Sequence, residues 1–354
     1  MYFFAICWDF HYESYVDSSF YSLGPNQILN SVEESLAGEF AGLMLTGRAQ
    51  ALNSIENRVY EIELENKHGE ISSVVAKFYR PDRWSSLQIL EEHEFLQELK
   101  LEEVPVVEAL ALQGSRVVNE TAFAFGNTLA RTDDGIYFAL FRKIRARSFD
   151  ELNLDQLKMF GRFLARLHVV GSRKKFRFRN SLSVVSYGWD SLKELGDRGF
   201  LDDNLGQRYE KLVLGLLEIL DQLMQEESAI RLHGDCHLGN LLWLDDRPIF
   251  VDFDDSLMGP PVQDIWMVAH RRDDRNRKLS DTLIDAYEEM REFPSDTLRL
   301  IEALRCLRLI HYSAWIAKRW EDPSFPKMFP HFGGEKWWSE EIEALSQISE
   351  ILQT

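Results

Sequence analysis

The chain contains the sequence Arg231-Leu-His-Gly-Asp-Cys-His-Leu-Gly-Asn-Leu-Leu-Trp243, followed by Ile249-Phe-Val-Asp-Phe-Asp-Asp255. Asp235 and Asn240 stand in the spacing D-x-x-x-x-N, and Asp252 ends the second apolar run. Two apolar runs separated by a tight turn predict a β-hairpin, which would bring Asn240 close to Asp252. Carboxylate and amide oxygens suit a hard cation such as Mg²⁺. The segment therefore predicts a magnesium site at the mouth of a hairpin.

Asp235 is the candidate catalytic residue of this segment. Protein kinases combine a base aspartate, an asparagine five residues later and a metal-binding aspartate further downstream. A carboxylate close to an incoming hydroxyl can orient it and accept its proton. A turn aspartate that caps its own backbone is the simpler alternative. That alternative explains one aspartate, but not the spacing, the hairpin and Asp252 together.

The composition is that of a soluble globular protein, with 45% hydrophobic and 28% charged residues. A chain of 354 residues is expected to form about two domains. The 40 basic and 58 acidic residues give a net charge of −18, which argues against a nucleic-acid binder because such proteins carry a basic surface. Three cysteines without a regular spacing favour a reduced, cytoplasmic setting.

The sequence also argues against a membrane protein. No stretch approaches the roughly 18 apolar residues of a membrane span. The apolar start of the chain is short and lacks the basic region of a signal peptide. We expect a protein without a membrane partner, and we favour a monomer.

Hydrophobic periodicity divides the chain into two parts near residues 142–145. The first part alternates apolar and polar residues, and its predicted strands are residues 58–64, 73–79, 109–112, 121–125 and 137–141, with one helix over 86–99. The second part has the amphipathic period of helices, predicted over residues 153–170, 209–224, 262–269, 279–290, 297–318 and 340–352. Residues 1–36 show little periodicity, and we expect them to form an extension that packs on the strand-rich part.

Lys77 lies in the middle of an apolar strand, where a lysine costs free energy unless its ammonium is paired. A lysine on an edge strand that reaches out to water is the ordinary explanation. Glu92, on the following helix, favours another one, because kinases pair a strand lysine with a helix glutamate to hold nucleotide phosphates. Glu91 and Glu94 are alternative partners, and Glu92 is preferred because it shares a helix face with Phe95.

The polar loop Asn53-Ser-Ile-Glu-Asn57 precedes the first predicted strand. Its hydroxyl and backbone N–H groups could cover phosphates, but an ordinary polar turn is the more common explanation of such a loop. Neither a G-x-G-x-x-G sequence nor a Walker A sequence occurs in the chain.

Two other clusters have ordinary interpretations. His233, Cys236 and His237 are too closely spaced for a tetrahedral zinc site, and no second Cys/His pair accompanies them. The basic run Arg173-Lys-Lys-Phe-Arg-Phe-Arg179 is expected to be a solvated face, with an acidic partner segment as the alternative.

With these residues assembled, the chain resembles the aminoglycoside phosphotransferase/choline kinase superfamily, and within it the bacterial stress response kinase A branch of Ser/Thr protein kinases. The resemblance extends from about residue 52 to residue 338. The matching stretches are Leu52-Asn-Ser-Ile-Glu-Asn-Arg-Val-Tyr60, Ala76-Lys-Phe-Tyr-Arg-Pro-Asp-Arg-Trp84, Gln88-Ile-Leu-Glu-Glu-His93, the segments 231–243 and 250–255, Gly259-Pro-Pro-Val-Gln-Asp-Ile-Trp-Met267 and Asp322-Pro-Ser-Phe-Pro-Lys327.

The resemblance implies an α+β, bilobal protein kinase-like fold with a small antiparallel-sheet N-lobe (37–142) and a larger, mainly helical C-lobe (143–354). Residues 1–36 are then an N-terminal extension. It also implies ATP and Mg²⁺ as cofactors. The implied roles are Asp235 as proton acceptor, Asn240 and Asp252 as metal ligands, Ser54 in the ATP loop, Lys77 on the phosphates and Glu92 as the partner of Lys77.

The sequence therefore predicts an ATP- and Mg²⁺-dependent phosphotransferase acting on protein Ser/Thr, with the protein itself as one candidate substrate. A small-molecule kinase for an aminoglycoside, choline or homoserine is the first alternative, because the phosphate chemistry would be identical. A non-catalytic pseudokinase is the second. It is disfavoured because Lys77, Asp235 and Asp252 are all present.

Overall fold

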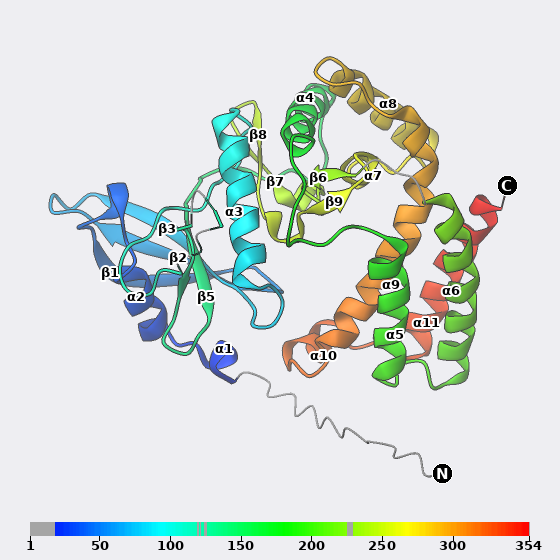
Figure 1. The fold of residues 1–354 in the computed structure, drawn as a ribbon, viewed down its shortest axis with the longest axis horizontal. Coiled ribbons are helices and arrows are strands. Elements are labelled where there is room, and N and C mark those ends of the chain that lie inside the picture. The colour runs from blue at the N-terminus through cyan, green and yellow to red at the C-terminus, as the bar shows by residue number, and fades with distance from the viewer. Residues whose placement is uncertain (1–17, 119, 121, 124–125, 225–228, 354) are drawn as a thin grey trace, which may run out of the picture.

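The computed structural model describes residues 18–118, 120, 122–123, 126–224 and 229–353. Two lobes are visible in Figure 1, joined after strand β5. The N-lobe contains α1 (Ser18–Ser22), α2 (Pro25–Glu33), β1 (Met44–Leu52), β2 (Arg58–Glu65), β3 (Ile71–Phe78), α3 (Ser86–Leu101), β4 (Ala130–Arg131) and β5 (Tyr137–Arg142). Its five strands form one antiparallel sheet in the order β1-β2-β3-β5-β4.

Alternation along β2 and β3 builds the core of the N-lobe. Ile62 and Leu64 on β2, and Val74 and Ala76 on β3, turn one face of the sheet inward and are fully buried. Helix α2 covers this face, and its Ile28 belongs to the same core. Residues 20–36 of the predicted extension thus share the N-lobe core, while residues 1–17 lie outside the described part of the chain.

The strand prediction for the N-lobe was wrong at β1 and β4, which it missed, and at residues 109–112, which it assigned to a strand. Strand β1 was not predicted, because it is an exposed edge strand whose alternation is broken by an irregularity between Leu45 and Ala49, with Gly47 at a φ of 86°. Conversely, residues 109–112 form only a single bridge, between Ala109 and Phe141. Part of the predicted strand 121–125 lies outside the described residues.

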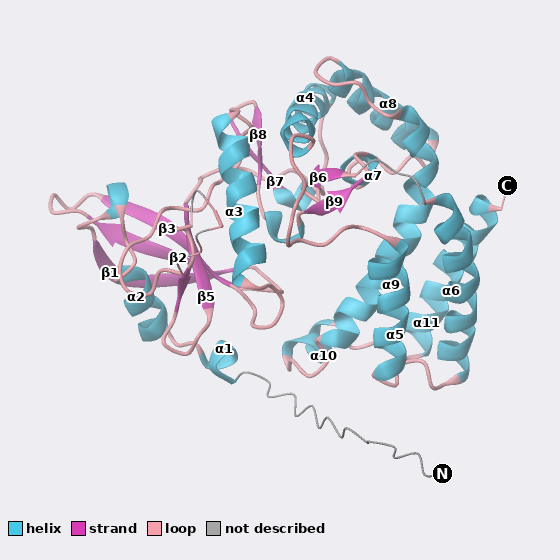
Figure 2. Ribbon diagram, in the orientation of Figure 1, coloured by secondary structure: helices cyan, strands magenta, loops and turns pink. Residues whose placement is uncertain are grey.

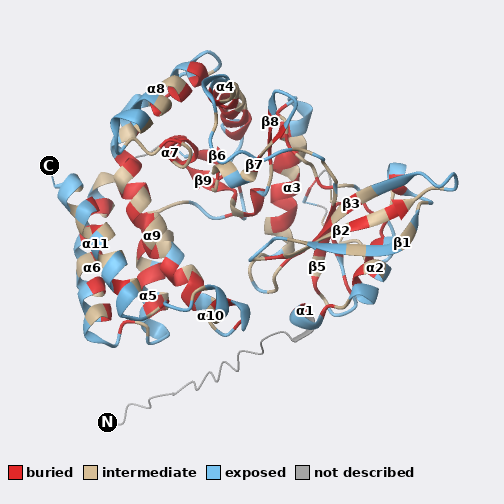
Figure 3. Ribbon diagram, turned by 180° about the vertical axis from the view of Figure 1, so that it is seen from behind, coloured by how far each residue is buried: buried red, intermediate tan, exposed pale blue. Residues whose placement is uncertain are grey.

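Helix α3 packs against both lobes. Ser85 caps it, since its side chain accepts from the backbone N–H of Gln88 while Gln88 reaches back to Ser85. Ile89 and Leu90 pack toward the sheet, and Phe95 belongs to the main core of the C-lobe. Figure 3 shows α3 largely buried between the lobes.

The C-lobe is mainly helical and contains two small two-stranded antiparallel sheets, β6 with β9 and β7 with β8 (Figure 2). Its elements are α4 (Leu154–Gly171), α5 (Asp190–Asp197), α6 (Asn204–Leu223), β6 (Ile230–Leu232), β7 (Leu241–Leu244), β8 (Arg247–Phe250), β9 (Leu257–Gly259), α7 (Val262–Trp266), α8 (Asp274–Glu288), α9 (Ile301–Lys318), α10 (Ser324–Met328) and α11 (Glu335–Leu352). The predicted α+β fold with a sheet-rich and a helical part is confirmed. Among the described helices, none is both long and apolar enough to cross a bilayer.

Candidate active site

The loop between β6 and β7 carries the predicted base and is braced by Asp264 on α7. The backbone N–H groups of His233 and Gly234 donate to the Asp264 carboxylate at 3.0 and 2.9 Å. Gly234 has a φ of 84°, and a Cβ there would lie 2.2 Å from the carbonyl oxygen of Asp255. Only glycine fits this approach, which holds the loop against the segment after β8.

Asp235 lies in this loop with its carboxylate held on two sides. Its Oδ2 accepts from Nδ2 of Asn240 at 3.3 Å and lies 3.3 Å from Nε2 of His237. Its Oδ1 lies 2.9 Å from Nη2 of Arg308, on α9.

These contacts keep the Asp235 carboxylate charged. Burial raises the pKa of Asp235, but the hydrogen bond from His237 and the charge of Arg308 outweigh burial, so the pKa lies well below its usual range. At neutral pH the side chain is therefore ionised and can accept a hydrogen bond from a hydroxyl.

The predicted hairpin is confirmed. Strands β7 and β8 pair with Leu241 opposite Phe250, and the N–H of Val251 donates to the carbonyl oxygen of Asn240 at 3.1 Å. Asn240 and Asp252 therefore lie at the same end of the hairpin. Asp252 adopts left-handed backbone angles (φ 60°), and its half-exposed side chain lies on the side of Lys77.

The donor set at the hairpin mouth suits Mg²⁺. It offers the carboxylate of Asp252 and the side-chain amide of Asn240. Because Nδ2 of Asn240 donates to Asp235, the amide oxygen is the atom that remains for an ion. Among the described residues no three His, Cys, Asp or Glu side chains meet as a metal cluster. Mg²⁺ does not need one, because it keeps several waters and takes phosphate oxygens from the nucleotide alongside one or two carboxylates.

Lys77 is buried and paired, and in this structure its ion-pair partners are Asp254 and Asp252 rather than the predicted Glu92. Its Nζ lies 2.9 Å from Asp254 Oδ1 and 3.3 Å from Asp252 Oδ1. Burial lowers the pKa of Lys77, and the carboxylates of Asp254 and Asp252 outweigh that, so the pKa is raised well above its usual value. The lysine stays charged, and it reaches across the lobes to residues 251–255, called here the metal-site loop because they include the predicted ligand Asp252.

Glu92 is instead occupied by Arg179, whose Nη1 lies 3.4 Å from Glu92 Oε2. The guanidinium of Arg179 is fully buried and also donates to backbone carbonyls of Gln88, Asp254 and Ser256. Burial raises the pKa of Glu92 to about 7, against the opposing charges of Lys77 and Arg179. Glu92 thus acts on Lys77 only by long-range electrostatic attraction, without a direct contact. Arg179 joins α3 to the metal-site loop.

The basic run is a docking segment for α3. Backbone N–H groups of Arg177, Phe178 and Arg179 donate to the Glu91 carboxylate at 2.5, 2.8 and 2.9 Å. Further along α3, Lys174 pairs with Glu98 at 2.6 Å. The run therefore binds an acidic face within its own chain, rather than serving only as a solvated surface.

Ser54 lies in the loop between β1 and β2. It is exposed, and its Oγ accepts from the backbone N–H of Asn57 at 3.2 Å. The same loop reaches the metal-site loop, because Asn57 Nδ2 donates to Asp254 at 3.2 Å. Glu56 fastens it to the C-lobe through Trp315 of α9 and Arg319, which follows that helix. Ser54 thus lies in a loop that its neighbours Asn57 and Glu56 fasten to Asp254 and to the α9 region.

Asp254 and Arg83 are site residues to which the sequence pattern assigned no firm role. The Asp254 carboxylate is buried and contacts Lys77, Asn57 and Arg83, and Arg83 also pairs with Asp255. Burial raises the pKa of Asp254, but Arg83 and Lys77 outweigh it and hold the pKa well below its usual range. The sequence did point to Arg83, because the stretch Arg80-Pro-Asp-Arg83 directly follows the Lys77 strand. It could not show that Arg83 pairs with Asp254, which lies 171 positions further along the chain.

His233, Cys236 and His237 do not form a zinc site. His233 is hydrogen-bonded to the carbonyl oxygen of Val251 through Nε2 at 2.9 Å, as expected for a structural residue. Cys236 is fully buried, which raises the pKa of its thiol well above the usual value. Its thiol therefore packs in the core.

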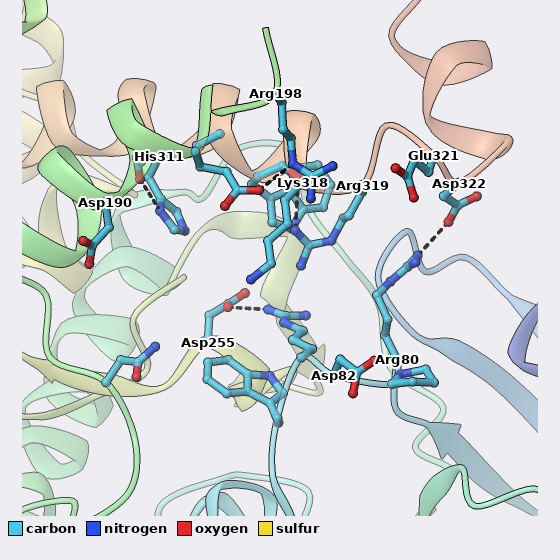
Figure 4. Close-up of a pocket in the computed structure, with 18 of the residues that line it drawn as sticks. Arg80, Asp82, Asp190, Arg198, Asp255, His311, Lys318, Arg319, Glu321 and Asp322 are labelled. Carbon is cyan, nitrogen blue, oxygen red and sulfur yellow. Dashed lines mark hydrogen bonds and ion pairs between the residues drawn. The ribbon is translucent and has the colours of Figure 1, made fainter. Parts of the chain in front are cut away.

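A pocket of about 450 Å³ lies beside the metal-site loop, between the segment after β3 and helices α5 and α9. Arg83 and Trp84 form one wall and His311, Trp315 and Lys318 another, with Asp255 between them. Figure 4 shows Asp255 and Lys318 pointing into this same space. Its volume lies within the range of about 300–1,000 Å³ that is usual for ligand-binding pockets.

Comparisons with known proteins agree with this geometry. Residues 48–301 match the model of the phosphotransferase enzyme family (APH). The chain is 36% identical over 335 residues to "Serine/threonine protein kinase RdoA" of Salmonella typhimurium, covering 94% of this chain and 95% of that protein. It is also 36% identical to "Stress response kinase A" of Escherichia coli K12, covering 95% of each.

Among solved structures, the chain is similar to the amicoumacin kinase hAmiN in complex with AMP-PNP, Ca²⁺ and Ami. The TM-score is 0.63 with 16% identity, over 90% of this chain and 93% of that one. At this identity the likeness shows a shared fold. The match to the family model over residues 48–301, together with the two relatives aligned over nearly their whole length, shows that the chain belongs to the phosphotransferase enzyme family.

Proposed function

We propose that this protein is a Ser/Thr protein kinase of the stress response kinase A type, which transfers the γ-phosphate of ATP to a protein hydroxyl. The observation that carries the proposal is the meeting of Asp235, Asn240 and Asp252 at one hairpin mouth, opposite a buried lysine from the other lobe. The names of the two relatives, aligned over nearly the whole chain, support protein Ser/Thr as the acceptor class.

Each residue has one task in this proposal. Asp235 orients the acceptor hydroxyl and takes its proton. Asn240 and Asp252 would hold Mg²⁺, which supplies neutralisation of phosphate charge when bound. Lys77, released from Asp254 and Asp252, would pair with nucleotide phosphates, and the loop around Ser54 would cover them with its hydroxyl and N–H groups. Glu92 supports Lys77 from a distance, because its negative charge raises the pKa of the lysine.

The experiment that tests the proposal measures transfer from γ-labelled ATP to dephosphorylated casein and to the protein itself. Label on Ser or Thr is the expected result. In parallel reactions kanamycin, choline and homoserine serve as acceptors. Label found on one of these and on no protein would place the acceptor among small molecules and overturn the protein-kinase assignment.

Removal of divalent cations is expected to abolish this transfer, because the phosphate charge would then face the Asp252 carboxylate without a counter-ion. EDTA should stop incorporation of label, and excess Mg²⁺ should restore it. Excess Mg²⁺ should not restore label incorporation by the Asp252→Asn variant. Asp246→Asn, an identical change at the exposed turn of the β7–β8 hairpin, is the matched control and should behave as the unaltered protein. Transfer that continues in EDTA would contradict the metal assignment.

A further inference from the structure

Arg308 is the cation in closest contact with the proposed base, and neither the family match nor the proposed function uses it. Its Nη2 lies 2.9 Å from Asp235 Oδ1, and 43% of its side chain is exposed. It lies on α9 on the same face as His311, Trp315 and Lys318, because these residues succeed one another at helical spacings of three and four. Those three residues line the 450 Å³ pocket, so Arg308 continues the pocket wall toward the catalytic loop.

The two oxygens of Asp235 have different surroundings. Oδ2 faces its own loop, where Asn240 and His237 contact it. Oδ1 is buried beneath Arg308, and no described residue gives it an aligned hydrogen bond, although the guanidinium lies at ion-pair distance. Oδ1 is therefore the atom that remains for a donor arriving from the α9 side, and Arg308 covers it.

We propose that Arg308 covers the acceptor-facing oxygen of Asp235 in this conformation and moves onto the transferred phosphoryl group when an acceptor hydroxyl takes its place. The inference rests on the proposed phosphotransfer. A half-exposed single ion pair is weak and easily exchanged, whereas a planar guanidinium binds phosphate oxygens with two parallel hydrogen bonds. The position beside Asp235 puts the guanidinium next to the place where charge develops.

The step balances without a further reagent. The acceptor oxygen forms a bond to the γ-phosphorus, and the bond between that phosphorus and the β–γ bridging oxygen breaks with its electron pair leaving on ADP. The acceptor proton passes to Asp235 Oδ1. Arg308 gives up no proton; its fixed positive charge faces the equatorial oxygens of the group in transfer.

The test compares Arg308→Ala and Arg308→Lys with the unaltered full-length protein, using labelled ATP and dephosphorylated casein. Arg308→Ala is expected to lower kcat by about 10²–10³-fold, as for loss of one fixed donor at a developing charge, with the KM for ATP within about twofold. Added guanidinium should restore part of the lost rate. Arg308→Lys should fall between the two, because it keeps the charge without the planar fork.

A second measurement examines the covering role. Arg308 shields Asp235 Oδ1 from water, so its removal should raise the ratio of ATP hydrolysis to casein phosphorylation several-fold. Arg162→Ala is the matched control, since Arg162 is also a half-exposed arginine in a single ion pair, with Glu289 far from the site. It should match the unaltered protein in rate and ratio.

The outcomes separate the two proposals. An unaltered protein that labels no acceptor overturns the proposed function. An active protein whose Arg308→Ala variant keeps full kcat overturns only the role of Arg308. A variant that folds, as shown by its melting temperature, but loses activity without recovery in guanidinium and without a change in the ratio also overturns it, because a structural effect would then be the cause.

Discussion

Asp235→Asn is expected to lower phosphotransfer by about 10²–10⁴-fold, the contribution of a positioned general base. The amide keeps the size of the side chain and can still accept from Asn240, but it cannot take the acceptor proton, and it loses the charge contact with Arg308. Initial rates of labelling measure the effect. ATP binding and the melting temperature should stay close to those of the unaltered protein.

Asp246→Asn again supplies the control, because it makes the same chemical change at an exposed hairpin turn. Full activity in Asp235→Asn would show that the base lies elsewhere. A loss of ATP binding as large as the loss of rate would show that the substitution acts on the fold of the loop instead.

Asp254→Ala is expected to destabilise the protein by about 3–5 kcal/mol, the usual consequence of removing one partner from a buried ion pair. Its carboxylate is buried, with the residue 2% exposed, and lies between Lys77 and Arg83, so its removal leaves two cations partly uncompensated. Urea denaturation monitored by Trp fluorescence measures the shift in midpoint. The isosteric Asp254→Asn should lose less stability.

The activity of these variants tests which carboxylate positions Lys77. Asp254→Asn should raise the KM for ATP more than Glu92→Gln does, since Asp254 contacts Lys77 at 2.9 Å and Glu92 contacts Arg179 instead. A larger effect of Glu92→Gln would show that Lys77 exchanges Asp254 for Glu92 during turnover. Lys77→Met sets the scale for complete loss of the lysine.

The catalytic segment could be predicted from the sequence because its signals are local. Asp235 and Asn240 are five residues apart, and a two-strand hairpin carries Asp252 back to them. A short turn between apolar runs fixes such a hairpin with no information from the rest of the chain. The same reasoning failed for β1, where the exposed edge position and the irregularity near Gly47 removed the alternation on which strand prediction depends.

The partner of Lys77 could not be predicted in this way. Helix α3 comes soon after the Lys77 strand, so its glutamates were the partners that the sequence suggested. The partner in the structure is Asp254, far along the chain in the other lobe, because the packing of the lobes brings the metal-site loop to β3. Arg179, which the sequence placed in a basic surface run, is fully buried and holds Glu92.

The sequence by itself identified the candidate groups: a base aspartate, two oxygen ligands and a strand lysine. Short-range folding is enough to bring the first three together. The tertiary structure alone decided how their charges are balanced. Arg83 and Lys77 meet at Asp254, Arg179 meets Glu92, and Arg308 covers Asp235. The reason is physical: Coulomb attraction depends on distance in space, and each of these contacts joins segments that only tertiary packing brings together.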